Sequence, residues 1–269
     1  MSAQQETGSV NAAIIAGCIV AFISFGFAAT FGVFLRPMSG DLGWGREVFS
    51  LSLAIQALCW GVTQPVAGMV ADRYGTARVL AFGAIVSALG FHVAFIQTHL
   101  PAYIADKGLA PSIGAWSLAL IGLFNIAGSF LSGWSGQIYS KKKVLASIYF
   151  SRAIVITVFI LTPISPLSVY IFSAVMGVLW LSTVPLTTGL VAQTQGLSYL
   201  STLAGLVFFS HQTGSFVGAW MGGRIYDIYQ DYTGMWWAAI GFGLLATLLH
   251  LPIREEAGPL ARREAQAQK

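Results

Sequence analysis

The chain is built from long apolar blocks that carry very few charged residues. Only 9% of its 269 residues are Asp, Glu, Lys or Arg, whereas 56% are hydrophobic. A soluble domain carries about 25% charged residues, because its surface has to be hydrated. Apolar blocks of about 20 residues match the hydrocarbon thickness of a lipid bilayer when they are helical. The sequence therefore predicts an all-α fold, a polytopic membrane helix bundle.

We expect eight transmembrane helices, joined by connections too short to hold a soluble domain. Lys and Arg are distributed unevenly outside these spans, nine on one side of the bilayer and three on the other. This bias predicts that both termini are cytoplasmic, in the inner cell membrane. Residues 1–10 carry no Lys or Arg, so we expect the first span to stay uncleaved. The expected spans are residues 12–35, 49–71, 79–105, 113–138, 144–163, 167–192, 201–225 and 235–251.

A short internal repeat marks two of the expected cytoplasmic connections. Residues 68–81 align with residues 133–146, at an offset of 65 residues. In both copies a Gly, a Tyr, a small residue, a basic residue and the triplet Val-Leu-Ala recur in register. Each copy runs from the end of one span into the start of the next. Repeated halves are a common construction in secondary transporters.

The first copy resembles the signature loop between the second and third helices of the major facilitator superfamily. Thr76 and Ala77 depart from that signature, because basic residues are usual at these two positions. The resemblance implies a cytoplasmic gate, in which a charge network forms and breaks as the helices move. The alternative is a tight turn whose charges only orient the chain. The signature positions are Gly68, Asp72, Arg73, Gly75 and Arg78.

Within that superfamily, the chain looks most similar to the bacterial monocarboxylate-transporter-like branch. Residues 31–35, 43–46, 180–186, 211–218 and 223–227 carry this resemblance. It implies secondary transport of a small organic anion, a monocarboxylate, by proton coupling or exchange. It also implies twelve helices with six spans between the signature loops, whereas only two spans separate them here. We therefore expect residues 1–90 to be a shortened N-terminal bundle and residues 91–269 a C-terminal six-helix bundle, joined near residues 89–92.

Six polar or ionisable residues inside the expected spans are candidates for the substrate pathway. Arg152 lies about 12 Å into its span, where a charge is costly and usually faces a cavity. Its guanidinium can pair with a carboxylate through two hydrogen bonds, or it can snorkel or serve a structural hydrogen bond. The histidines can titrate near neutral pH, and each polar residue also fits an ordinary interhelical contact. The six are Arg152, His92, His99, Asn125, His211 and Gln212.

Two smaller patterns concern residues 201–227. Gly214, Gly218 and Gly222 recur every four residues, which predicts a helix face that packs closely against another helix. Arg224 and Asp227 are three residues apart, which predicts a local ion pair at the outer surface.

Other functions remain open beside transport. The missing spans favour a transport-inactive remnant. The glycine face favours an interaction subunit, in which dimerisation would replace the wall of the transport pathway that the missing spans would form. The sequence contains no phosphate-binding Walker loop, no His-Glu-x-x-His and no Gly-x-Ser-x-Gly. We therefore expect no enzyme activity, no cofactor and no metal. Nucleic acid is not an expected partner, because the basic residues lie in short loops rather than on one face.

Overall fold

The computed structural model describes residues 31–72, 79–258, 261–263 and 266, without the side chains of residues 66–72 and 79–89. Over this part of the chain the fold is all-α and contains no strand, which confirms the predicted fold class. Within it, four segments are long and apolar enough to cross a membrane by length and composition. These are Pro111–Ile138, Lys141–Leu161, Pro166–Gln195 and Thr233–His250.

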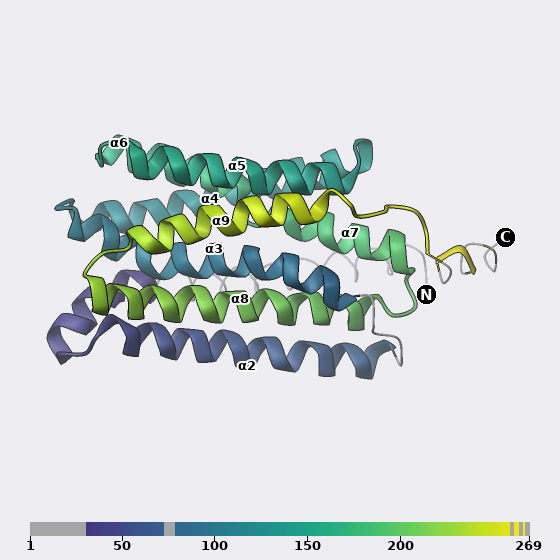
Figure 1. Ribbon diagram of the computed structural model, residues 1–269, viewed down its shortest axis with the longest axis horizontal. Helices are drawn as coiled ribbons and strands as arrows, with labels where there is room; N and C mark the ends of the chain where they lie inside the picture. Colours follow the sequence, from purple (N-terminus) through teal and green to yellow (C-terminus); the bar gives the residue numbers. More distant parts are fainter. Residues whose placement is uncertain (1–30, 73–78, 259–260, 264–265, 267–269) are drawn as a thin grey trace, which may run out of the picture.

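The described helices run side by side as a bundle (Figure 1). Residues 31–42 are helical, so this helix extends through part of the connection expected at residues 36–48. It ends before Gly43, whose positive φ of 64° suits the residue after a helix. The helices that follow are α2 (Arg46–Asp72), α3 (Val79–Asp106), α4 (Pro111–Ile138), α5 (Lys141–Leu161), α6 (Pro166–Leu179), α7 (Thr183–Gln195), α8 (Leu200–Tyr229) and α9 (Thr233–His250).

Most helices agree with the expected spans to within a few residues, but the span expected at residues 167–192 is divided. It consists of α6 and α7, which are separated by residues 180–182. Both copies of the internal repeat run from one helix into the next, from α2 into α3 and from α4 into α5.

Helix α8 packs between α2 and α3, and glycines on its surface permit the close approach. A Cβ atom added at Gly218 would lie 2.5 Å from the carbonyl oxygen of Phe91, and one added at Gly222 would overlap the His99 ring. Gly205 approaches the backbone of α2 in the same way. Small residues bring helix backbones together in membranes. Two glycines of the predicted repeat, Gly218 and Gly222, therefore pack against α3 of the same chain.

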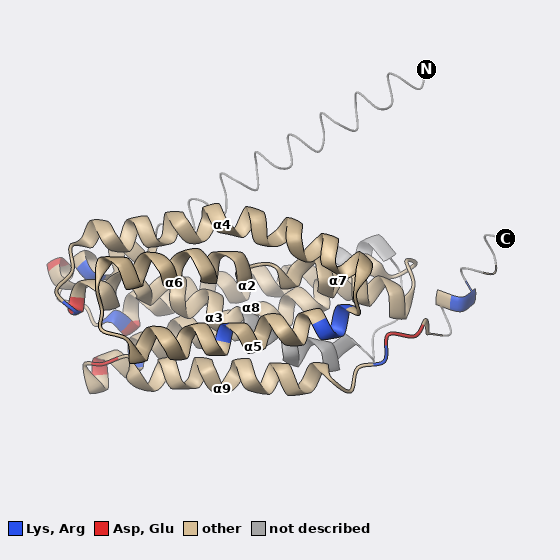
Figure 2. Cartoon of the chain, turned by 90° about the horizontal axis from the view of Figure 1, so that it is seen from above, with Lys and Arg blue, Asp and Glu red and all other residues tan. Residues whose placement is uncertain are grey.

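Most of the Lys, Arg, Asp and Glu residues lie toward the two ends of the bundle, as the colouring in Figure 2 shows. At one end, the buried guanidinium of Arg46 donates two hydrogen bonds to Asp106, at 2.7 and 2.9 Å. It also donates to the Tyr232 hydroxyl at 2.9 Å, and it lies 3.6 Å above the centre of the Tyr226 ring. These contacts join the start of α2 to the end of α3, to the end of α8 and to the residue that precedes α9.

The expected pair between Arg224 and Asp227 does not form, because both residues bind the start of α2. Arg224 donates to Glu47 at 3.0 Å. The Asp227 carboxylate accepts the backbone N–H groups of Arg46 and Glu47, at 2.9 and 2.8 Å. The first N–H groups of a helix have no partner inside it, and a carboxylate there also interacts favourably with the helix dipole.

At the opposite end, the segment after α9 is tied to α5 and α7. The Glu255 carboxylate accepts a hydrogen bond from the backbone N–H of Lys142 at 2.7 Å. The backbone carbonyl of Glu255 accepts another from the Gln193 side chain at 2.8 Å. Partial burial opposes ionisation of Glu255, but hydrogen bonds from Lys142 and Ser140 hold its pKa below the usual range. The beginning of α5 therefore anchors the C-terminal segment as well as carrying positive charge.

Candidate functional site

A cavity of about 720 Å³ lies among the helices of the bundle. Its walls come from residues 31–32, from α2, α3, α4, α7 and α8, and from the residues between α6 and α7. This volume is within the range of about 300–1,000 Å³ that is typical of small-molecule sites. Among the described residues, no Asp, Glu, Lys or Arg lines it. Its polar groups are Gln56, Gln97, Thr98, Ser129, Thr187, Thr188, His211, Gln212 and Ser215.

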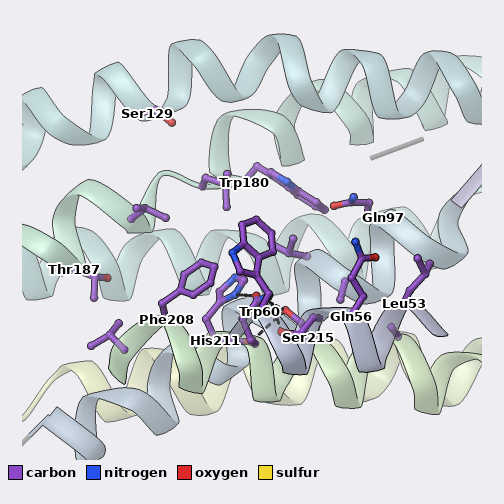
Figure 3. A pocket seen from close by; sticks show the side chains of 18 of the residues that line it. Leu53, Gln56, Trp60, Gln97, Ser129, Trp180, Thr187, Phe208, His211 and Ser215 are labelled. Atoms are coloured by element: carbon purple, nitrogen blue, oxygen red, sulfur yellow. Dashed lines mark hydrogen bonds between the residues drawn. The ribbon is translucent and has the colours of Figure 1, made fainter. Parts of the chain in front are cut away.

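One wall of the cavity is an aromatic group from α2 and α8. The rings of Phe208 and His211 stack at 5.8 Å with an interplanar angle of 12°. Trp60 meets Phe208 edge to face at 5.6 Å. Trp180, from the segment between α6 and α7, lies on the other side (Figure 3). A planar or apolar part of a ligand would find contact area on both sides.

His211 and Gln212 form a hydrogen-bonded pair at this wall. The Gln212 amide donates from Nε2 to the Ala57 carbonyl at 3.1 Å, which leaves its Oε1 as an acceptor. The His211 Nδ1 lies 2.8 Å from that Oε1. Nδ1 therefore carries the hydrogen in neutral His211, and a second proton would bind at Nε2. Of the six pathway residues predicted from the sequence, these two line the cavity.

Arg152 and Asn125 lie beside the cavity, at the segment that divides α6 from α7. Arg152 is 1% exposed and donates hydrogen bonds to the carbonyls of Leu179 and Trp180. Asn125 accepts the Leu181 N–H at 2.9 Å. Neither residue lines the cavity itself, although Trp180 and Leu181 do.

His92 and His99 lie outside the cavity lining and join α3 to its neighbours. The Nε2 of His99 lies 2.8 Å from the Ala219 carbonyl, and a carbonyl can only accept. Its Nδ1 therefore accepts from the Tyr232 hydroxyl at 3.1 Å, so both ring nitrogens are used. His92 donates from Nε2 to the Ala239 carbonyl at 2.6 Å. This geometry matches the interhelical alternative considered for each histidine.

The predicted gating loop is described only in part. Gly68 and Asp72 lie in the last two turns of α2, without described side chains. Arg73, Gly75 and Arg78 lie outside the described residues. The gate therefore stays a prediction.

The sequence analysis did not select two kinds of polar residue that line the cavity, the glutamines and the hydroxyl residues. Gln56 and Gln97 are strongly polar residues inside apolar spans, which is the criterion that selected Asn125 and Gln212. The hydroxyl residues gave no such signal, because Ser and Thr often satisfy their own helix backbone, as Ser215 does with the His211 carbonyl at 3.1 Å.

Two comparisons with known proteins bear on this site. The family model described as Major Facilitator Superfamily matches residues 17–105. The "Uncharacterized MFS-type transporter YcxA" of Bacillus subtilis (strain 168) is 27% identical over 160 residues, which is 58% of this chain and 38% of that protein. The chain thus covers less than half the length of this relative. Both similarities relate part of this chain to membrane proteins of the major facilitator type. The junction expected near residues 89–92 stays a prediction.

Proposed function

We propose that this chain is a secondary active transporter of the major facilitator type, and that it carries a small organic anion, a monocarboxylate, through the described cavity. Proton coupling or exchange drives the movement. The chain lies in the inner cell membrane with both termini cytoplasmic. The observation that carries the proposal is a cavity of suitable volume, with convergent polar groups, among apolar helices.

The charges around the cavity favour an anion. No carboxylate lines the described wall, so no negative side chain there repels one. Arg152 is buried beside the wall, and no described carboxylate pairs with it. Its Nη1 is buried without a hydrogen-bond partner. Buried charge without a counter-ion is costly, and a bound carboxylate would reduce that cost.

His211 is the best placed of the candidate histidines for proton coupling. It lines the cavity, and Gln212 holds its Nδ1–H, so Nε2 remains for an added proton. A protonated imidazole would attract the anion, and loss of the proton would weaken that attraction. Proton and anion would then bind together and leave together.

We expect uptake of a labelled small monocarboxylate into proteoliposomes to follow an imposed proton gradient. His211→Gln keeps hydrogen bonding but cannot titrate, so the gradient dependence should disappear. Arg152→Gln removes the buried charge and should lower uptake at least about tenfold, the effect of losing one hydrogen bond to a charged group. Thr213→Ala, on the exposed face of α8, is the matched control. Uptake that is unchanged in both His211→Gln and Arg152→Gln would contradict the anion and proton assignments.

A second candidate function is an inactive or dimerising membrane protein, with residues 1–90 as a shortened first bundle and residues 91–269 as a six-helix bundle. Its support is the large exposed apolar surface of α4, where Trp116, Phe130 and Trp134 are 64%, 77% and 58% exposed. Lipid or a second copy could cover this surface. Uptake activity that rises with protein density in the vesicles would favour the dimer, and no uptake by correctly inserted protein would favour the inactive chain.

A further inference from the structure

We propose that Arg152 and Asn125 clamp the break between α6 and α7 and thereby position Trp180 and Leu181 in the cavity wall. Arg152 is then a positioning residue, whose hydrogen bonds shape the site in addition to its charge. The inference rests on the proposed function only in taking the cavity as the place where the substrate binds.

The break interrupts an apolar segment that is otherwise long enough to cross a membrane. Pro166–Gln195 forms one candidate span of 30 residues, but α6 ends at Leu179 and α7 begins at Thr183. A break leaves carbonyl and N–H groups without their helical partners. Within a membrane there is little water to replace those partners, so other protein groups have to do so.

Arg152 supplies hydrogen bonds to the carbonyl groups at the end of α6. Its Nε donates to the Leu179 carbonyl at 3.0 Å, and its Nη2 donates to the Leu179 and Trp180 carbonyls. A cation at the C-terminal end of a helix also interacts favourably with the helix dipole. The planar guanidinium can serve two neighbouring carbonyls at once, which a lysine ammonium does with less fixed geometry.

Asn125 binds the other side of the break. Its Oδ1 accepts the Leu181 N–H at 2.9 Å, from α4 rather than α5. The Ser182 hydroxyl donates back to the Val178 carbonyl. Trp180 and Leu181 are thus held by side chains from α5 and α4, and Ser182 is held by its own hydroxyl.

The surrounding packing keeps this arrangement in place. Arg152 lies 5.1 Å from the centre of the buried Tyr149 ring. A Cβ atom added at Gly128 of α4 would overlap the Val178 carbonyl oxygen near the end of α6 and lie 2.7 Å from the Ser182 hydroxyl oxygen, so α4 touches both α6 and the break. Trp180 and Leu181 extend from this fixed segment into the cavity wall. Changes in the clamp should therefore alter the wall even when the net charge is unchanged.

The accessibility of residue 181 to a thiol reagent tests the clamp without any substrate. We would replace Cys18 and Cys59 by serine, introduce Leu181→Cys, and measure the rate of labelling by a membrane-permeant maleimide in the purified protein. Asn125→Ala keeps every charge, and Arg152→Lys keeps the positive charge but loses the guanidinium fork. Each should raise the labelling rate about tenfold, the consequence of losing about 1.4 kcal/mol of local hydrogen bonding.

Matched controls separate the clamp from general loosening. Ile126→Ala and Ile154→Ala change exposed neighbours on α4 and α5, 57% and 47% exposed, and should leave the rate unchanged. A second reporter, Thr188→Cys, lines the cavity farther along α7 and should not respond to the clamp variants. Equal rates in clamp and control variants, or equal acceleration at both reporters, would overturn the proposal.

The same variants distinguish this proposal from the transport proposal. Suppose that the clamp variants accelerate labelling at residue 181, but that neither the parent protein nor any variant transports an anion. The clamp proposal then stands and the proposed substrate is wrong. If the parent protein transports and Asn125→Ala leaves both the KM for uptake and the labelling rate unchanged, the clamp fails and transport stands.

Discussion

Replacing Asp106 with alanine is expected to destabilise the folded protein by about 3–5 kcal/mol, because a buried cation would lose its anion. The Arg46 side chain is 9% exposed and forms two hydrogen bonds to Asp106 at 2.7 and 2.9 Å. Arg36 also lies near Asp106, but it is half exposed and its Nε is 3.6 Å away. Thermal unfolding of the detergent-solubilised protein, followed by size-exclusion chromatography, would measure the loss.

The second ion pair at the same end of the bundle provides the control. Arg224 donates to Glu47 at 3.0 Å, but their side chains are 53% and 30% exposed. Exposed pairs contribute about 0–1 kcal/mol, because water screens both charges. Arg224→Ala should therefore change the unfolding temperature little. Equal losses in the two variants would show that burial does not decide the contribution of these pairs.

The positions of the helices could be predicted from the sequence, because the spacing of apolar blocks reports directly on bilayer crossing. The expected span at residues 79–105 differs from α3 by one residue at its end, and the expected span at 235–251 by two or fewer at each end of α9. The break between α6 and α7 could not be predicted in this way. Residues 180–182 are Trp, Leu and Ser, and the only breaker signal just after them is Pro185, which has no N–H to donate to the Leu181 carbonyl. The hydrogen bonds that Arg152 and Asn125 make to this segment come from residues distant in the sequence, so the spacing of apolar residues does not report them.

The site was predicted only in part, because a polar residue in a span has several ways to satisfy its hydrogen bonds. His92 and His99 are seven residues apart and share a helix face, as expected from their spacing. That face points toward carbonyls of α8 and α9 rather than toward the cavity. Spacing along one helix indicates which residues point together. Which neighbour they meet depends on the packing of the whole bundle.

The approach of α4 to the break leads to the last prediction. Gly128→Val is expected to destabilise the protein by about 3 kcal/mol, because the added atoms would enter space that backbone already fills. A Cβ atom at this position would overlap the Val178 carbonyl oxygen and lie 2.7 Å from the Ser182 hydroxyl oxygen. Backbone cannot rotate away as a flexible side chain can, so α4 has to move away from α6. The unfolding temperature in detergent would measure the effect.

Gly122→Val on the same helix separates this clash from the general effect of placing valine in α4. Gly122 is exposed, and a Cβ atom added there would meet nothing within 4 Å. Both variants add the same β-branched side chain to a helix interior, so their helix propensities change equally. Any difference in unfolding temperature then reports the contact with the break. If Gly128→Val were as stable as Gly122→Val, α4 would not lie against the break, and Asn125 could not hold the Leu181 N–H from there.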